Sequence, residues 1–400
     1  MPSHNGIGMT SHNITMTLLC ECSICVVNRW LNYPYFNNVL DACVDFLAKQ
    51  AKELGLTIKT YEVVPRKPIV ILTWLGKDPS QPSILLNSHM DVVPVFENSW
   101  TYPPFSAHID KDGKIFARGS QDMKCVGIQY LEAIRKLKQS GVVQLKRTLH
   151  ISFVPDEEIG GHDGMEKFVK TNEFKALNLG FALDEGMANP DENKVLRGRG
   201  SGGSFHTNYY KHSRLFSPWI MTYLLRCDPK LKIGDVTTIN LTQVYGGVQS
   251  NVVPEKLTAV FDVRLAVTVN HEQFEEMVNK WCKEAGEGVT IEFEQKNPNV
   301  ECTKLDNSNP YWICCFTHKK LKLDCRIFPG GTDSRYVRRV GIPALGFSPM
   351  NNTPVLLHDH NEYLDADIFL KGIDIYVPVT FLIKSFFWLK KSIYYYYLQS

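Results

Sequence analysis

The residues of this sequence with the clearest chemical potential are acids and histidines that directly follow short apolar runs. Residues 153–161 (FVPDEEIGG) are the strongest case, because an alternating apolar run ends there in three consecutive acids. Like charges packed together are costly unless a cation neutralises them or water solvates them, so this segment predicts either a bound metal or full exposure. Its proline and paired glycines indicate a loop rather than the charged face of a helix.

Acids and histidines take a similar position at other points of the chain. The full set is His89 and Asp91, Asp122, Asp156 with Glu157 and Glu158, Asp184 and Glu185, and His358, His360 and Glu362. Open α/β sheets bind ligands beyond the carboxyl ends of their strands, so these residues are expected to share one edge. A pair of zinc ions about 3.5–4 Å apart needs nitrogen and carboxylate ligands with one bridging carboxylate, which this set provides. Taken singly, Asp122 is adequately explained as an acid that complements a helix dipole.

The elements that must position these residues alternate between strands and helices. Apolar spacing predicts a helix from Asn38 to Leu54 and a second helix that begins near Asp122 and ends at Gly141. The near-continuous apolar run before His89 is typical of a buried strand in a largely parallel sheet. Strands are predicted over 58–64, 69–74, 83–88, 147–154, 180–184 and 342–347. This rhythm predicts an α/β fold with a mostly parallel sheet flanked by helices.

The length of 400 residues predicts about two domains. The α/β pattern is interrupted by a shorter α+β stretch and then resumes. We therefore predict a discontinuous α/β domain with a smaller inserted α+β domain. The boundaries are 34–189 and 301–377 for the discontinuous domain, 190–300 for the insert, and 1–33 and 378–400 for two atypical terminal segments.

Three local predictions concern the insert and the C-terminal region. Residues 197–203 (RGRGSGG) are interpreted as a flexible linker, because glycine and serine favour irregular chain. A helix is predicted to start near Asn270 within the insert. Another begins at Ala366 and is predicted to end near Pro378, since proline removes a backbone donor and clashes with the preceding turn.

Charge and cysteine usage exclude several classes of partner. The 44 basic and 42 acidic residues leave a net charge of +2, which gives no electrostatic basis for binding nucleic acid or an anionic membrane. The apolar stretch 381–389 is too short and too interrupted by lysine to cross a bilayer, which needs about 20 apolar residues. Eleven mostly scattered cysteines fit buried thiols in a reducing compartment, so a cytoplasmic location is expected. Cys20, Cys22 and Cys25 have zinc-like spacing but no second pair that would complete a structural site.

Five segments of the sequence share a pattern with a known family. They are SHMDVVP (88–94), ARGSQDMK (117–124), FVPDEEIGGH (153–162), ALDEG (182–186) and LLHDHNE (356–362). Together they resemble the M20 family of co-catalytic metallopeptidases. The resemblance continues through ordinary stretches and covers about residues 34–192 and 229–377, so it is more specific than a short motif match.

The resemblance implies a role for each member of the metal-ligand set, with two Zn²⁺ ions per subunit. One ion would be held by His89, Asp122 and Glu185, and the other by Asp122, Glu158 and His358. Asp122 would therefore bridge the two ions. Asp91 would fix the tautomer and orientation of His89. Glu157 would be the general base that deprotonates the bridging water.

Two positions stay open on the residues alone. Asp184 stands beside Glu185, and His360 stands close to His358, so either member of each pair is a possible ligand. The spacing in the family favours Glu185 and His358. His360 is then interpreted as a surface residue or as a hydrogen-bonding neighbour of the site.

The resemblance also implies that the chain hydrolyses an N-acyl-L-amino acid, a small molecule, to a carboxylate and the free L-amino acid. Asn251, Arg264 and Arg335 are the candidates for binding the carboxylate of the substrate. Arginine suits this role because its guanidinium donates two parallel hydrogen bonds, although a surface ion pair explains either arginine equally well. Two other hypotheses stay open: a dipeptidase or carboxypeptidase that uses the same metals, and a metal-binding relative with impaired catalysis.

The likeness breaks within the predicted insert. The family carries a Gly-x-x-Gly-His-(Ala/Ser) stretch and a long helix there, whereas this chain has residues 197–208 (RGRGSGGSFHTN) and a shorter unit. The histidine of the family helps to stabilise the oxyanion across a dimer interface, and His206 is the nearby candidate for that role. The resemblance implies that the discontinuous α/β domain is the catalytic domain, that the insert is a lid or dimerisation domain, and that the protein is a homodimer. The shortened lid leaves that homodimer open for this chain.

Overall fold

The computed structural model describes residues 37–191, 195–201, 203–209, 228, 231–298, 300–312 and 323–382. The predicted terminal segments lie outside the described residues, apart from 378–382, and so do Cys20, Cys22 and Cys25. Among the helices that are described, none combines the length and the apolar character that a membrane span needs.

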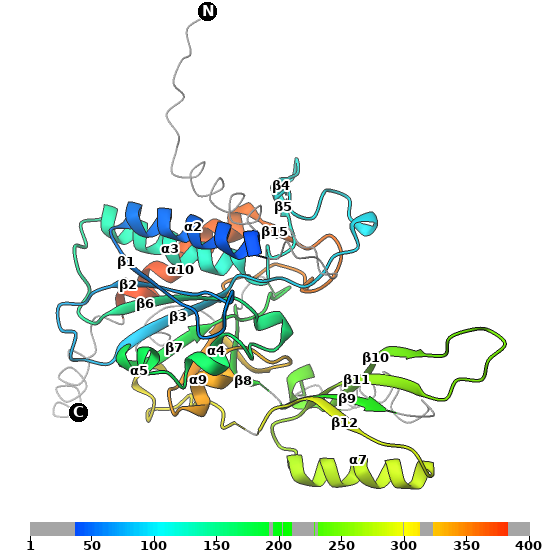
Figure 1. Cartoon of the computed structure of the whole chain (residues 1–400). Coiled ribbons are helices and arrows are strands. Elements are labelled where there is room, and N and C mark those ends of the chain that lie inside the picture. The colour runs from blue at the N-terminus through cyan, green and yellow to red at the C-terminus, as the bar shows by residue number, and fades with distance from the viewer. Residues whose placement is uncertain are drawn as a thin grey trace, which may run out of the picture.

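The described strands of the larger part form an eight-stranded sheet in the order β1-β2-β6-β3-β7-β14-β8-β13 (Figure 1). Their bounds are β1 Thr57–Tyr61, β2 Ile69–Trp74, β3 Ser83–His89, β6 Leu149–Val154, β7 Leu179–Asp184, β8 Val195–Ser201, β13 Leu323–Phe328 and β14 Ala344–Phe347. The central strands β6, β3, β7 and β14 run parallel, as do β8 and β13, and the other pairs are antiparallel. The predicted α/β fold is confirmed, as a mixed sheet with a parallel centre.

Helices cover both faces of this sheet (Figure 1). The first face carries α2 Asn37–Leu54, α3 Lys124–Gln139 and α10 Ala366–Leu382, and the second carries α4 Met165–Phe168, α5 Asn172–Ala176 and α9 Ser334–Arg339. Side chains that alternate along β3 contribute to the hydrophobic core on each face of the sheet. Leu86 is buried under the first group of helices and Leu85 under the second. Every residue of β3 and of β6 is buried, which explains their near-continuous apolar character.

The helix that was predicted to end near Pro378 continues through it to Leu382. Proline cannot donate to the carbonyl one turn earlier, and this local cost was the reason for predicting a stop. Burial overrides it: Tyr376 and Val379 lie in the core that α10 shares with α2 and α3. The Tyr376 hydroxyl also donates to the carbonyl of Phe347 (2.6 Å). The prediction was wrong because tertiary contacts hold the helix together on both sides of the proline.

A smaller antiparallel sheet in the order β10-β11-β9-β12 forms the second part, with one helix packed on it (Figure 1). The bounds are β9 Gly203–Tyr209, β10 Thr238–Gly246, β11 Leu257–Leu265, β12 Glu292–Lys296 and α7 His271–Ala285. The helix begins where it was predicted, because the Asn270 side chain accepts a hydrogen bond from the backbone of Gln273 (3.0 Å). Phe274 and Val278 of α7 pack with Val263 of β11.

The described residues of the flexible linker predicted at 197–203 belong instead to two strands. β8 lies in the large sheet beside β13 and β14, and β9 begins at Gly203 in the small sheet. Glycine predicts irregular chain because its backbone is permissive, but pairing with neighbouring strands keeps this segment extended. The chain therefore crosses from one sheet to the other here, and the domain boundaries at 190 and 300 stay predictions.

A three-stranded sheet in the order β15-β5-β4 lies near the loops that follow β3. Its bounds are β4 His108–Ile109, β5 Lys114–Phe116 and β15 Tyr363–Asp365, and the remaining short elements are η1 Glu97–Ser99, η2 Glu157–Ile159, η3 Ile233–Asp235 and α8 Pro310–Trp312. β15 pairs antiparallel with β5. This pairing brings the segment after His358 next to the segment before Asp122.

His150 is a buried histidine of the central strand β6, and it predicts a pH dependence of stability. Its Nδ1 lies 2.9 Å from Thr73 Oγ1, and burial lowers its pKa to about 4. The unfolded chain takes up this proton near pH 6.5, whereas the folded protein does so only near pH 4. We therefore expect the free energy of unfolding to fall as the pH drops from about 6.5 to about 4, by about 3 kcal/mol in total.

The variant His150→Gln removes this titration and isolates its contribution. Urea unfolding of metal-free wild type and variant between about pH 4 and pH 7 measures the difference. The free energy of unfolding of the wild type should fall more steeply toward acid than that of the variant. Parallel pH profiles would contradict the assignment.

Candidate metal centre

The acids and histidines predicted to share an edge lie mainly at the carboxyl ends of adjacent parallel strands. His89 is the last residue of β3, residues 156–158 follow β6, and Glu185 follows β7. Asp122 comes from the loop before α3, and His358 comes from the loop between β14 and β15. Five separate segments of the chain therefore meet at one place.

Two groups of possible metal ligands form at this edge, and they share Asp122. The ligand atoms within each group lie within 4.8 Å of one another: His89, Asp122 and Glu185 in one group, and Asp122, Glu158 and His358 in the other. His89 Nε2 is 3.0 Å from Asp122 Oδ1 and 3.8 Å from Glu185 Oε2. His358 Nε2 is 3.3 Å from Asp122 Oδ2 and 3.1 Å from Glu158 Oε2. The two oxygens of Asp122 face opposite groups, as a bridging carboxylate requires.

This cluster holds more negative charge than its own cations neutralise. Burial and the Asp122 carboxylate raise the pKa of Glu158, and they raise that of Glu185 well above its usual range. Burial also acts to raise the pKa of Asp122, but hydrogen bonds with His358 and His89 hold it well below its usual range. Among the described atoms, the buried Glu158 Oε1 has no hydrogen-bond partner. Imidazoles and crowded carboxylates without a thiolate are a donor set that fits a pair of divalent cations.

Asp91, which was predicted to orient His89, contacts both the histidine and the acidic turn. His89 Nδ1 lies 2.8 Å from the backbone carbonyl of Asp91 and 3.4 Å from its carboxylate. The backbone N–H groups of Glu157 and Glu158 donate to the two carboxylate oxygens of Asp91, at 3.1 and 3.0 Å. Asp91 therefore fixes the position of the acidic turn relative to the imidazole, with its backbone carbonyl on His89 and its carboxylate on the turn.

The adjacent glutamates of the turn η2 point in different directions. Glu158 Oε2 faces His358, whereas Glu157 Oε1 lies 3.6 Å from Arg335 Nη1. Glu157 belongs to neither ligand group that the described residues form. Burial raises the pKa of Glu157 well above its usual range, although the nearby charges of His89 and Arg335 oppose this rise. The turn therefore presents one carboxylate to the ligand group and a second, separate carboxylate beside it.

Arg335 is buried against the end of this turn. Its Nη2 donates to the carbonyl of Gly160 (2.7 Å), and in the described part of the chain its Nε is buried without a partner. Gly160 and Gly161 have φ angles of 102° and 64°, which favour glycine. A Cβ at Gly161 would also lie 2.4 Å from Asp333 Oδ1, so the paired glycines let the chain turn directly after the acids.

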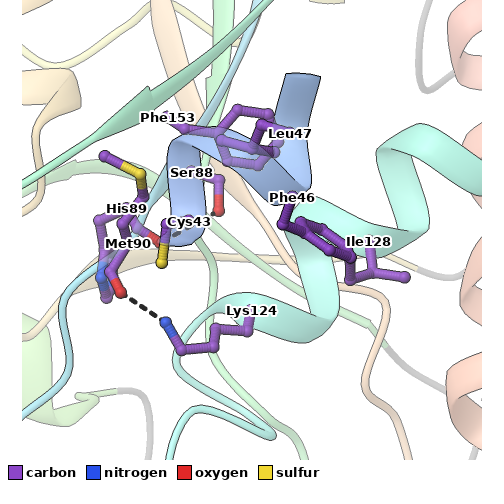
Figure 2. A pocket seen from close by; sticks show the side chains of 9 residues that line it. All are labelled: Cys43, Phe46, Leu47, Ser88, His89, Met90, Lys124, Ile128 and Phe153. Carbon is purple, nitrogen blue, oxygen red and sulfur yellow. Dashed lines mark hydrogen bonds between the residues drawn. The ribbon is translucent and has the colours of Figure 1, made fainter. Parts of the chain in front are cut away.

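A small, mostly apolar hollow lies beside His89, between α2, α3 and β3 (Figure 2). It is lined by Cys43, Phe46, Leu47, Ser88, His89, Met90, Lys124, Ile128 and Phe153. The Lys124 amino group donates to the carbonyl of Met90. Gly127 lets α3 approach β3 closely, because a Cβ there would lie 2.8 Å from Ser88 Oγ. The apolar lining leaves the orientation of the imidazole to the acids on its other side.

The residues alone left two choices open, Asp184 or Glu185 and His358 or His360. In each pair the two side chains point toward different partners. Asp184 accepts hydrogen bonds from Asn87 Nδ2 (2.9 Å) and from the backbone of Ser334 (2.7 Å), one on each carboxylate oxygen. His360 is exposed and makes an edge-on contact with Phe96, at 6.0 Å between ring centroids. Neither Asp184 nor His360 belongs to the ligand groups found among the described residues.

Two further acids of the predicted set bind the loops rather than join a ligand group. Asp156 Oδ2 accepts from the backbone of Asp163 (2.8 Å), and Glu362 Oε2 accepts from Arg118 Nη1 (2.7 Å). No role was predicted from the sequence for Arg118 or Gln121. The available signal was their position in the segment ARGSQDMK, directly before Asp122.

The predicted substrate-binding residues lie in different places. Asn251 is exposed in the connection between β10 and β11, and Arg264 of β11 donates to Asp262 (2.8 Å). Within the described part, neither Asn251 nor Arg264 is hydrogen-bonded or ion-paired to a ligand-group residue, whereas Arg335 lies beside the acidic turn. His206 is placed on β9, opposite Asp262 of β11.

Known proteins resemble this chain along most of its length. The model of peptidase family M20/M25/M40 matches residues 85–380. Aminoacylase-1 of Mus musculus is 50% identical over 359 residues, which are 83% of this chain and 88% of that protein. The family resemblance found in the sequence is therefore confirmed.

Solved structures share the fold. An M20 family metallo-carboxypeptidase from Sulfolobus solfataricus has a TM-score of 0.71 at 18% identity, and the match covers 94% of this chain and 99% of that one. A dinuclear metal-binding peptidase of the M20 family from Bacillus subtilis has a TM-score of 0.61 at 16% identity, with coverage of 93% and 98%. At these identities the likeness shows the fold alone.

Proposed function

The chain belongs to peptidase family M20/M25/M40, and from this premise we propose that it hydrolyses N-acyl-L-amino acids to a carboxylate and the free L-amino acid. The chain is a hydrolase, and its 50% identity to an aminoacylase-1 supports this substrate class. One observation carries the chemistry: the two carboxylate oxygens of Asp122 face two separate groups of metal ligands. This arrangement suits a pair of ions that act on one substrate.

The two ligand groups are proposed to hold two zinc ions. The assignment is His89, Asp122 and Glu185 for one ion and Asp122, Glu158 and His358 for the other. Zinc binds imidazole nitrogen and carboxylate oxygen in open catalytic sites, which matches this donor set. When bound, such ions lower the pKa of a shared water and polarise the acyl carbonyl of the substrate.

Glu157 is proposed to move the proton. It shares a turn with the ligand Glu158, but its carboxylate lies outside both ligand groups, so it is free to act as a base. Glu157 takes the proton of the attacking water as the new C–O bond forms. It then delivers this proton to the amine nitrogen as the C–N bond breaks. Asp91 keeps the acidic turn and the His89 imidazole in fixed positions relative to each other during both steps.

Arg335 is proposed to bind the carboxylate of the substrate, because it is a buried guanidinium beside the base. The variant Arg335→Lys keeps a cation near Glu157 but loses the planar pair of donors. We expect KM for N-acetyl-methionine to rise about 10- to 100-fold, as the loss of a hydrogen bond to a charged group predicts, while kcat changes less. Steady-state kinetics measure both values. A fall in kcat at unchanged KM would assign Arg335 to Glu157 instead of to the substrate.

Asn251 and Arg264 stay predictions for the same carboxylate, and a homodimer stays a prediction for the assembly. A cytoplasmic location is also proposed. The mostly scattered spacing of the eleven cysteines supports a reducing compartment. Sedimentation of the purified protein would measure the oligomeric state.

The substrate class is tested by comparing N-acetyl-methionine with a dipeptide, as a dipeptidase substrate, and with a longer peptide, as a carboxypeptidase substrate. Faster turnover of N-acetyl-methionine supports the proposal. Faster turnover of a peptide would favour the dipeptidase or carboxypeptidase hypothesis, whose metals and fold are the same. Binding of two metal ions without turnover of any of these substrates would favour a metal-binding relative with impaired catalysis.

A further inference from the structure

Glu362 is a fully buried carboxylate that the proposed mechanism does not use. It accepts hydrogen bonds from Arg118 Nη1 (2.7 Å) and from the backbone N–H groups of Gly119 (3.2 Å), Gln121 (2.6 Å) and Asp122 (3.3 Å). These four donors come from one stretch of five residues that ends at the bridging acid. Glu362 therefore anchors the whole loop that delivers Asp122 to the two ligand groups.

Gln121 makes the reverse connection, from this loop to the segment that contains Glu362. Its Nε2 donates to the carbonyls of Pro354 (3.1 Å) and Tyr363 (2.7 Å), and its Oε1 accepts from the backbone of Leu356 (3.1 Å). The loop 118–122 and the segment 354–363 therefore hold each other through two side chains. We call this pair of interactions, made by Glu362 and Gln121, the loop clamp.

His358 belongs to the segment 354–363 that the loop clamp holds, and its surroundings must keep this proposed ligand in place. The side chain of His358 is 52% exposed, whereas that of Asp122 is only 9% exposed. The backbone of His358 has a φ of 64°, which is uncommon for a residue other than glycine. Its Nε2 must nevertheless remain close to both Asp122 (3.3 Å) and Glu158 (3.1 Å). A mobile segment 354–363 would not keep these two distances.

We propose that Glu362 is a positioning residue, and that with Gln121 it sets the distance between His358 and Asp122 before any metal binds. The inference rests on the proposed function of the two ligand groups. Glu362 is not itself a ligand, because its oxygens are directed at the loop 118–122 and it belongs to neither group formed by the described residues. Its role is to preform the group of Asp122, Glu158 and His358.

Titration of the metal-free protein with Zn²⁺ in a calorimeter tests this role without relying on activity. We expect wild type to bind two equivalents, and Glu362→Gln to bind one of them about 10- to 100-fold less tightly, as is typical when a residue that supports a ligand is lost. The weakened equivalent is assigned to the group of Asp122, Glu158 and His358. Gln121→Ala removes the other half of the loop clamp without changing a charge, and it should shift the same equivalent in the same direction. Turnover of both variants should recover as Zn²⁺ is raised, because every ligand is still present.

Ser83→Ala is the matched control, since Ser83 is buried at the opposite end of β3 and its hydroxyl donates to the carbonyl of Leu177 (2.5 Å). Wild-type Zn²⁺ affinity in this control supports the inference, whereas an equal loss of affinity would show general destabilisation and overturn it. If Glu362→Gln fails to fold, the Zn²⁺ affinity of Gln121→Ala decides whether the inference holds. Folded variants with wild-type affinities would overturn the inference and leave the proposed function intact. A wild type that binds no pair of ions would overturn both.

Discussion

Replacing Glu157 by glutamine is expected to lower kcat for N-acetyl-methionine by about 10²- to 10⁴-fold, the range that a positioned general base contributes. The amide has nearly the shape of the carboxylate but cannot accept the proton of the attacking water. Because Glu157 belongs to neither ligand group in the described structure, the variant should still bind two metal ions. Steady-state kinetics and elemental analysis of the same sample measure both quantities.

Glu158→Gln is the matched control, because it makes the same change one residue along the same turn. Glu158 belongs to a ligand group, with its Oε2 3.1 Å from His358 Nε2. This control should lose metal as well as turnover. If Glu157→Gln lost its metal and Glu158→Gln kept it, the two glutamates would have the opposite roles. Full activity of Glu157→Gln would place the base elsewhere.

Replacing Asp122 by asparagine is expected to weaken both metal sites together. Asp122 presents Oδ1 toward His89 (3.0 Å) and Oδ2 toward His358 (3.3 Å), and an amide has one oxygen and no negative charge. Loss of a supporting residue costs about 10- to 100-fold in metal affinity, so loss of this shared ligand should cost more than about 100-fold at each site. Turnover should become undetectable at micromolar metal. Calorimetric titration with Zn²⁺ and an activity assay would measure these changes.

Asp359→Asn is a suitable control for this second variant, because it also removes one negative charge near His358. Asp359 is exposed and accepts a hydrogen bond from the backbone of His360 (2.7 Å). The Asp359→Asn variant should keep two metal ions and wild-type turnover. If Asp122→Asn lost only one of the two ions, Asp122 would not bridge them, and the two sites would have to be assigned separate ligands.

The main elements of the fold follow from local pattern. The buried runs before His89 and before Asp156 became β3 and β6, and the helix predicted near Asn270 begins at His271. These predictions succeeded because apolar periodicity reports burial directly. They failed where neighbours outweigh local preference, as at residues 197–201 and 203, which belong to β8 and β9, and at Pro378, which a packed helix tolerates.

At the candidate site, too, local pattern predicted some features and tertiary contacts decided others. The residues alone did not distinguish Asp184 from Glu185, because both are carboxylates at the end of one strand. In the structure the two carboxylates face different partners: Asp184 accepts from Asn87 and Ser334, and Glu185 lies near His89. Asp184 is the last residue of β7 and Glu185 is the next residue. Successive side chains of an extended chain point to opposite sides, so one position decides which acid reaches the ligand group.

The sequence by itself determined the kinds of ligand and the strands that precede several of them, since these depend on residue type and on apolar spacing along the chain. The family was indicated by the resemblance of five motifs to the M20 family. The shared role of Asp122 was implied by the resemblance, whereas only the tertiary structure decided that Glu362 and Gln121 join the loop 118–122 to the segment that contains His358. The hydrogen bond between Glu362 and Gln121 connects residues 241 positions apart. Such contacts depend on how distant segments pack, and no local pattern encodes that packing.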